Sequence, residues 1–351
     1  MKKLIGMFCA LVFAAAAYSE AFTWEAPLRG VTGNLSLSDD DLRHLAQDWN
    51  VNSVRLMLMS GDVRHPEPPY YILDHKLEEI DHFLESCEKY GIRCILDVHE
   101  TPGRVEWRGE KDRRLWTSFE FHQYLIETWE ILAKRYADKG PVIAGYDLFN
   151  EPNMYEEQAD APSDWNLLVK KLVQAIRKHD KTHPIIIEPT RWGGADGFET
   201  LEPVDDPLVI YSFHFYVPHQ FTHQRVGDNK GTYSYPGEIN GKSWDKQALL
   251  KAMQPAIEFQ QKTGAPMYVG EFSAIRWAPD GSALRYLKEV VDIFEQNGWH
   301  WSYHAYREWQ GWSLEHQGPM DQPEKVKSTP RLEFMKEIWT KNTFDNASKK
   351  P

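Results

Sequence analysis

Short apolar segments alternate with amphipathic helical segments along the whole chain, and this alternation constrains the fold more than any other feature. The apolar segments are rich in β-branched and aromatic residues and are bounded by Gly, Pro or polar residues, as is typical of buried strands. Buried strands that alternate with helices form parallel sheets, and eight such units predict a single closed (β/α)8 TIM barrel of the α/β class. The expected strands cover residues 27–34, 51–59, 92–98, 142–149, 184–188, 208–216, 266–272 and 299–305.

The segments between the strands carry helix signals. Apolar residues recur there every three to four positions, and Ser38 followed by Asp41 predicts a capping box at the start of the first helix. Residues 193–207 are the exception, because they are too rich in Gly, Pro and acidic residues for more than a short helix. A doubly wound open sheet is the rival architecture, but no nucleotide-binding fingerprint supports it.

The first 19 residues have the composition of a secretory signal. Lys2 and Lys3 precede an apolar stretch at 4–17, and Ala17-Tyr18-Ser19 offers a small-residue cleavage site. No later stretch is apolar for long enough to span a bilayer. We therefore expect a secreted or periplasmic protein without a membrane partner, with a signal peptide at 1–19, one barrel domain at 20–342 and a polar tail at 343–351.

Charge and cysteine content exclude several partners. Removal of 1–19 takes away two Lys and no acid, so the net charge goes from −12 to −14, which disfavours nucleic acid and anionic membranes. The chain has no phosphate-cradling glycine loop and no Cys/His spacing typical of zinc, so we expect no cofactor and no metal. We expect Cys87 and Cys94 to pack in the core rather than form a disulfide, and the protein to be a monomer.

Polar and ionisable side chains gather toward the C-terminal ends of the expected strands. In a barrel these ends face one mouth, where barrel enzymes carry their chemistry. Each residue alone could be a structural ion pair, a satisfied core histidine or an ordinary strand aromatic, but packing does not explain all of them at one face. The residues are Arg55, His99, Glu100, Asn150, Glu151, Glu188, His214, Tyr216 and Glu271.

Glu151 and Glu271, at the ends of the fourth and seventh strands, form the candidate catalytic pair. Cleavage of a glycosidic bond requires two carboxyl groups in different protonation states, and in retaining enzymes they lie about 5–5.5 Å apart. We expect Arg55 and the Tyr216 hydroxyl to hold Glu271 ionised as the nucleophile. Glu151 would keep its proton and act as acid and then base, and Asn150 would donate to a sugar 2-hydroxyl.

Tryptophan provides an independent indication of a sugar substrate. The chain contains 14 Trp, and many lie in the expected loops after strands. Sugar rings present apolar C–H faces, which suit flat aromatic side chains with a polar edge. We interpret helical Trp, such as Trp49 and Trp129, as core. The loop tryptophans, some of which could also be core, are Trp107, Trp116, Trp192, Trp277, Trp309 and Trp312.

With these motifs in order, the chain resembles glycoside hydrolase family 5, the cellulase-like (β/α)8 barrels, over almost its whole length after the signal. The 150–152 tripeptide Asn-Glu-Pro resembles the acid/base motif of the family, and Gly-Glu-Phe at 270–272 resembles its nucleophile strand. The resemblance implies that further motif residues contact the substrate. These are Arg55, His99, Asn150, His214 and Tyr216.

The chain departs from the family pattern at the eighth strand, where relatives usually place a tryptophan under the scissile sugar. Trp301 precedes His304 by three residues, so the two side chains should point to opposite faces of the strand. We expect Trp301 to face the helices and His304 to face the mouth. Either Trp309 folds back across Gly311 to serve as the platform, or His304 and Tyr306 shape a different subsite.

The resemblance implies a retaining β-glycosidase that acts on an extracellular polysaccharide or oligosaccharide. An endo-β-1,4-glucanase is our first choice, and a β-mannanase or a mixed-linkage or branched glucanase follows. Exo action, as in an exo-β-glucanase or β-glucosidase, stays open because the loop at 99–103 resembles that of exo-acting members. Arg307 and Glu308 could reach hydroxyls of a substituted or non-gluco sugar.

Two other classes of protein compete with this interpretation. A catalytically silent carbohydrate-binding barrel would not need both Glu151 and Glu271. A metal-dependent barrel hydrolase has carboxylates and histidines available, but the chain lacks a His-x-His or another ligand pair at useful spacing.

Overall fold

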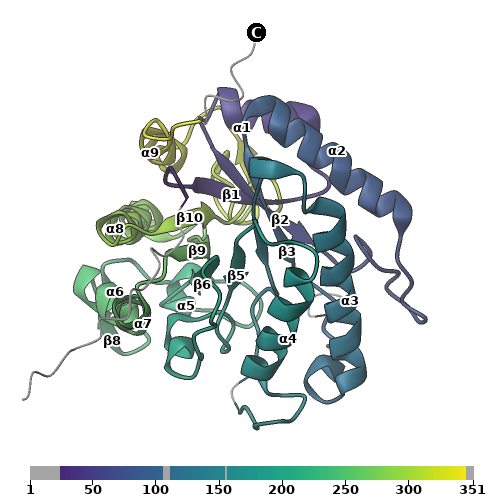
Figure 1. Cartoon of the computed structure of the whole chain (residues 1–351). Coiled ribbons are helices and arrows are strands. Elements are labelled where there is room, and N and C mark those ends of the chain that lie inside the picture. The colour runs from purple at the N-terminus through teal and green to yellow at the C-terminus, as the bar shows by residue number, and fades with distance from the viewer. Residues whose placement is uncertain (1–23, 106–110, 155, 345–351) are drawn as a thin grey trace, which may run out of the picture.

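The computed structural model describes residues 24–105, 111–154 and 156–344. The expected signal at 1–19, Trp107 and most of the expected tail at 343–351 lie outside the described residues. The described chain forms a closed parallel barrel with helices packed around it, which confirms the predicted (β/α)8 architecture (Figure 1).

The barrel strands run around the ring in the order β1-β10-β9-β6-β5-β4-β3-β2. Every neighbouring pair is parallel, so all C-terminal strand ends open toward the same mouth. All the predicted strands are present, although each is shorter than expected. Their bounds are β1 Arg29–Asn34, β2 Ser53–Leu58, β3 Arg93–Val98, β4 Ile143–Asp147, β5 Ile185–Ile187, β6 Val209–Phe215, β9 Met267–Phe272 and β10 His300–Tyr303.

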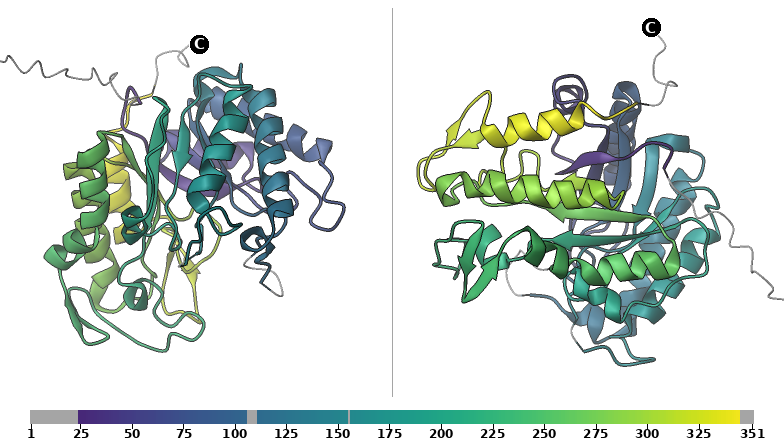
Figure 2. Two further views of the ribbon diagram at one scale, coloured as in Figure 1. Left: turned by 60° about the horizontal axis from the view of Figure 1, so that its bottom comes forward. Right: turned by 90° about the vertical axis from the view of Figure 1, so that its left-hand side faces the viewer.

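Helices cover the outside of the barrel, as the turned views show (Figure 2). The predicted capping box is present, because the Ser38 side chain accepts from the Asp41 N–H and Asp41 accepts from the Ser38 N–H. No helix in the described part of the chain has the length and apolar character needed to cross a membrane. The longer helices are α1 Asp39–Gln47, α2 Asp74–Tyr90, α3 Phe119–Tyr136, α4 Trp165–Arg177, α6 Lys246–Ala252, α7 Gln254–Thr263, α8 Ser282–Gln296 and α9 Pro330–Trp339.

Short elements fill the connections between these helices and strands. The segment after β5 contains only the 3-10 helix η3, Ala195–Glu199, as its composition predicted. Two small hairpins were not predicted, because their strands are too short to show a period-2 pattern. The remaining elements are η1 Arg114–Trp116, η2 Gly140–Val142, α5 His219–Thr222, η4 Pro279–Gly281, and the strand pairs β7 Gly237–Ile239 with β8 Lys242–Trp244 and β11 His316–Gln317 with β12 Glu324–Lys325.

An apolar cluster closes the barrel at the end opposite the mouth. Trp24, just before β1, is buried there and donates from Nε1 to the Ala144 carbonyl at 2.9 Å. Its ring meets the Tyr268 ring edge to face. Besides Trp24 and Tyr268, the cluster contains Leu28, Ile95, Ala144, Ile186 and Ile210. The interior of the barrel is therefore filled with apolar side chains below the site.

The two cysteines in the described part of the chain lie on a helix and in a strand, as the sequence pattern predicted. Cys87 on α2 and Cys94 on β3 are fully buried and are free thiols, as expected for core packing. Burial raises the pKa of the Cys87 thiol well above its ordinary value, so this thiol is an unreactive packing group.

Strand β10 has the orientation that the sequence predicted. Trp301 is fully buried toward the helices, where its ring lies 5.5 Å from that of Phe272 and 6.4 Å from that of Trp339. Its Nε1 donates to Glu295 on α8 at 2.9 Å. His304, just after the strand, lies on the opposite side and contacts the Glu271 carboxylate.

We predict that Trp301→Ala lowers the free energy of unfolding by about 3–5 kcal/mol, because it empties a large volume in a core that cannot collapse fully. Urea denaturation of the variant and the wild type measures the difference. A variant that unfolds within about 1 kcal/mol of the wild type would mean that Trp301 is not core, since surface changes have effects of that size.

Candidate active site

A buried arginine organises the mouth of the barrel. Arg55 on β2 is fully buried and contacts carboxylates that come from β3, β4, β9 and the end of β5. Burial alone disfavours its charge, but these carboxylates outweigh that effect and raise the pKa of Arg55 well above its ordinary value. The N–O distances are 3.2 Å to Asp97, 2.8 Å to Asp147, 2.9 Å to Glu188 and 2.8 Å to Glu271.

Asp147 is one of these four carboxyl groups, and its surroundings favour the protonated form. Burial raises the pKa of Asp147 well above its ordinary value, and the nearby Glu188 and Asp97 raise it further despite the contact with Arg55.

Glu271, on β9, is held as a carboxylate. Its Oε1 accepts from Arg55, and its Oε2 accepts from the Tyr216 hydroxyl at 2.9 Å, which are the two contacts predicted for it. The Nδ1 atoms of His304 and His214 lie 3.4 Å and 3.7 Å from the same Oε2. Burial would raise the pKa of Glu271, but the positive charges of His304, His214 and Arg55 outweigh it and hold this pKa well below its ordinary value.

His304 carries one of these positive charges. Its Nδ1 lies 2.9 Å from the Thr32 hydroxyl, and its Nε2 lies 2.9 Å from the Glu308 carboxylate. Burial opposes the charge, but the anions Glu271 and Glu308 raise the pKa of His304 to about 9. At neutral pH a charged imidazole therefore lies beside the Glu271 carboxylate.

Glu151 follows β4 in an unusual backbone conformation, with φ of 46°. Only a residue held by its surroundings keeps a left-handed conformation of this kind. The Glu151 N–H donates to Glu188 Oε2 at 2.9 Å, and the Glu151 carbonyl accepts from Arg104 at 2.9 Å. The Glu151 side chain is 16% exposed, against 6% for Glu271, so Glu151 is the carboxyl group more open to the mouth.

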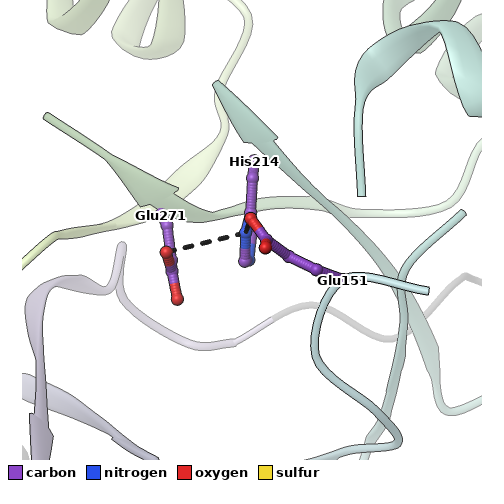
Figure 3. A group of neighbouring side chains, drawn as sticks. All are labelled: Glu151, His214 and Glu271. Carbon is purple, nitrogen blue, oxygen red and sulfur yellow. Dashed lines mark hydrogen bonds and ion pairs between the residues drawn. The ribbon is translucent and has the colours of Figure 1, made fainter. Parts of the chain in front are cut away.

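His214 lies beside both glutamates, and the two carboxylates converge on its ring (Figure 3). Its Nδ1 is 2.9 Å from Glu151 Oε1, and one oxygen of each glutamate lies within 4.8 Å of the other and of this ring. Its Nε2 is 3.1 Å from Glu188 Oε1. Burial opposes the charge of His214, but Glu188 and Glu271 raise its pKa well above the ordinary value, so it is an imidazolium at neutral pH.

Glu151, His214 and Glu271 also have the spacing of a three-ligand metal site. Each of these donors already has a protein partner, however. Glu271 accepts from Arg55 and Tyr216, and the Glu151 carboxylate lies 2.9 Å from His214 Nδ1.

Asn150 and His99 complete the polar lining of the mouth. Asn150 Oδ1 accepts from Arg55 at 3.1 Å, which orients the amide so that its NH2 group points away from Arg55. His99 Nδ1 lies 2.7 Å from Asp97 Oδ2, so the carboxylate fixes the ring and its tautomer. Both residues are buried at positions where a bound sugar could accept from the amide or contact the ring.

The loop after β10 brings two tryptophans toward the site. Trp312 is buried, and its ring lies 6.0 Å from that of Tyr216 and 6.3 Å from that of His304. Trp309 is half-buried and packs edge to face on Trp312 at 5.4 Å. Trp312 therefore lies between Trp309 and the rings of Tyr216 and His304.

Two further loop residues have protein partners. Arg307 pairs with Glu315 at 2.9 Å and with Asp41, which engages the guanidinium that could have reached sugar hydroxyls. Trp116 is buried and donates to Asn153 at 2.7 Å, so it is one of the loop tryptophans that pack in the core, an alternative that the sequence left open.

Several residues at the site were not assigned a role from the sequence. Glu188 was noted only as a polar strand end, whereas Asp97 and Asp147 were taken as ordinary strand residues. An acid that interrupts an apolar strand is a usable signal, because it must be paired if the strand is buried. Arg104 and Thr32 give no such signal, since their contacts depend on loop geometry.

A barrel mouth with two carboxyl groups in unlike environments, flanked by indole rings, defines a glycoside hydrolase. The family model for cellulase (glycosyl hydrolase family 5) matches residues 17–310, and the chain belongs to this family.

Related proteins agree with this assignment. Endoglucanase C of Acetivibrio thermocellus is 30% identical over 255 residues, which cover 65% of this chain and 72% of that protein. Cellodextrinase A of Ruminococcus flavefaciens is 26% identical over 265 residues, which cover 75% and 76%. A structure of Thermotoga maritima Cel5A with cellobiose has the same fold, with a TM-score of 0.70 at 23% identity over 88% of this chain and 96% of that one.

We predict that His304 makes stability depend on pH. Its pKa is raised to about 9, so its charge stabilises the folded state below the unfolded value of 6.5, and this contribution is lost as pH rises through 9. The difference in unfolding free energy between wild type and His304→Gln should therefore shrink by roughly 2–3 kcal/mol between pH 7 and 10. Urea denaturation at both pH values measures it.

His223→Gln is the matched control for this measurement. Burial lowers the pKa of His223 to about 3, so this neighbouring histidine is neutral throughout the range. The difference between wild type and His223→Gln should therefore stay constant between pH 7 and 10. A difference that also stays constant for His304→Gln would show that His304 is not charged in the folded protein.

Proposed function

We propose that this glycoside hydrolase is a secreted, retaining enzyme that cleaves a β-linked glucan, with Glu151 as acid/base and Glu271 as nucleophile. The observation that carries the proposal is the approach of the two carboxylates, one oxygen of each lying within 4.8 Å of the other. Retaining enzymes keep their carboxyl groups about 5–5.5 Å apart, whereas inverting enzymes need about 6.5–9.5 Å for a water molecule.

In the first step, Glu271 attacks the anomeric carbon and a covalent glycosyl-enzyme forms. Glu151 gives its proton to the glycosidic oxygen as the bond to the leaving sugar breaks. In the second step, Glu151 takes a proton from water, and that water displaces Glu271 from the sugar. The contacts of Glu271 with Arg55 and Tyr216 support this role, because they stabilise the carboxylate both before attack and as the leaving group.

The remaining polar residues of the mouth are proposed to bind the sugar at the point of cleavage. The Asn150 amide, oriented by Arg55, is the donor for the 2-hydroxyl, a contact that strengthens in the transition state. His304 with Glu308 is proposed to shape the side of the subsite next to β10. The proposed substrate-binding residues are Arg55, His99, Asn150, His214, Tyr216, His304 and Trp309.

β-1,4-Glucan is the proposed substrate because two related proteins are named endoglucanase and cellodextrinase. An exo-acting enzyme on short oligosaccharides is the second candidate. The charged pair of His304 and Glu308 favours it, since polar groups in place of a flat ring can recognise sugar hydroxyls individually. A panel of purified β-glucans, β-mannan and cello-oligosaccharides, assayed for new reducing ends, separates these substrates. Binding without turnover on the whole panel would favour the silent carbohydrate-binding barrel.

We predict that Glu271→Ala abolishes turnover of the best substrate, because no covalent intermediate can form. Azide added to this variant should restore part of the activity and give a product of inverted anomeric configuration, since the small anion enters the space left by the carboxylate. Reducing-end assays and NMR of the product measure both effects. Wild-type activity in Glu271→Ala would contradict the assignment of the nucleophile.

We predict that Trp309→Ala lowers kcat/KM on the true substrate by more than tenfold and changes the unfolding free energy little. Its half-buried ring packs on Trp312 and Trp277 and leaves part of its surface for a sugar. Trp301→Ala is the matched comparison, because the same substitution there removes a ring fully buried in the core. An early-melting Trp309→Ala with unchanged kinetics would show that Trp309 is a packing residue.

A further inference from the structure

Glu188, at the end of β5, is buried at the junction of the two halves of the site. Its side chain is fully buried, so its carboxylate must be satisfied by protein groups. Its Oε1 contacts Arg55 at 2.9 Å and His214 at 3.1 Å, whereas its Oε2 accepts the backbone N–H of Glu151 at 2.9 Å. One carboxylate thus joins the arginine beside the nucleophile, the central histidine and the backbone of the proposed acid/base.

Burial would raise the pKa of Glu188, but the positive charges of His214 and Arg55 and the Glu151 N–H hold it below its ordinary value. Glu188 is therefore held as a carboxylate, whereas burial shifts the pKa of Asp147, which also contacts Arg55, in the opposite direction. The two side chains also differ in reach, because Asp147 contacts Arg55 and Glu188 extends from Arg55 to the acid/base side of the site.

The backbone around Glu188 is shaped to keep it and His214 in contact. A Cβ on Gly193 would lie 2.5 Å from Glu188 Oε2, and a Cβ on Gly270 would lie 2.8 Å from His214 Nε2. A side chain at either position would collide with the pair. The His214 N–H also donates to the Gly193 carbonyl at 2.8 Å, so the loop after β5 is fixed against β6.

We propose that Glu188 is a positioning residue for the acid/base step, which holds the Glu151 backbone in its left-handed conformation and aims His214 at the Glu151 carboxyl group. The proposal rests on the function assigned above to Glu151. It adds that the geometry of proton transfer is set by a residue that touches neither the sugar nor the reacting oxygen.

The proton transfers follow from these contacts. In the first step, the proton moves from the Glu151 carboxyl group to the glycosidic oxygen as the bond to the anomeric carbon breaks. The new Glu151 carboxylate is stabilised by the His214 Nδ1–H, 2.9 Å away. In the second step, Glu151 takes a proton from water and returns to its starting state. His214 keeps its proton throughout, because Glu188 lies against its other nitrogen.

The test uses two aryl β-cellobiosides that differ only in how much their leaving group needs a proton. 2,4-Dinitrophenolate leaves without protonation, whereas phenolate needs it. Loss of acid catalysis therefore lowers kcat/KM mainly for the phenyl substrate. We expect Glu188→Gln to lose at least tenfold more kcat/KM on the phenyl than on the dinitrophenyl substrate. The measured quantity is the ratio of kcat/KM on the dinitrophenyl substrate to kcat/KM on the phenyl substrate. Because both values come from one preparation, a fraction of unfolded variant does not affect this ratio.

Asp147→Asn is the matched control, since Asp147 also contacts Arg55 but neither Glu151 nor His214 in any contact described above. The ratio of its kcat/KM values on the dinitrophenyl and phenyl substrates should equal that of the wild type, whatever its absolute activity. Glu151→Gln is the reference and should show the largest ratio of kcat/KM on the dinitrophenyl substrate to that on the phenyl substrate. An equal loss on both substrates in Glu188→Gln would overturn the positioning role. A Glu151→Gln variant without leaving-group dependence would overturn the assignment of Glu151 and this role together.

Discussion

The site depends on one guanidinium buried at the centre of the barrel. Arg55 contacts Asp97, Asp147, Glu188 and Glu271, so a single side chain of β2 connects strands around half of the ring. Removing charges from water costs several kcal/mol for each ion, and one cation cannot balance four anions. The surroundings reduce this imbalance by raising the pKa of Asp147, which favours its protonated form, and by adding imidazolium groups.

The charge states of Glu271 and of the histidines around it therefore depend on the cluster as a whole. The cations that keep Glu271 ionised are themselves kept charged by Glu271 and its neighbours, so neither state can change alone. His304 contributes to this balance, because its charge lies beside the Glu271 carboxylate. A substitution of His304 would therefore also change the electrostatics of Glu271.

Periodicity and strand ends predicted most of the fold and the two glutamates, because both signals are local in sequence. The apolar run of β4 that ends before Glu151 is an example. Contacts that depend on distance in space could not be predicted. The bond between Glu188 and the Glu151 N–H joins residues 37 positions apart, and nothing in either segment encodes it. For the loop after β10 the sequence left two alternatives open, and the order of Trp309 and Trp312 in it depends on backbone angles that composition does not specify.

The apolar cluster around Trp24 closes the end of the barrel opposite the site. The buried acids and histidines therefore lie between a packed floor and the mouth. Glu151 is the more exposed of the two glutamates, whereas Glu271 lies further inside against Arg55. A molecule that approaches the cluster from the mouth would thus meet the Glu151 carboxyl group before that of Glu271.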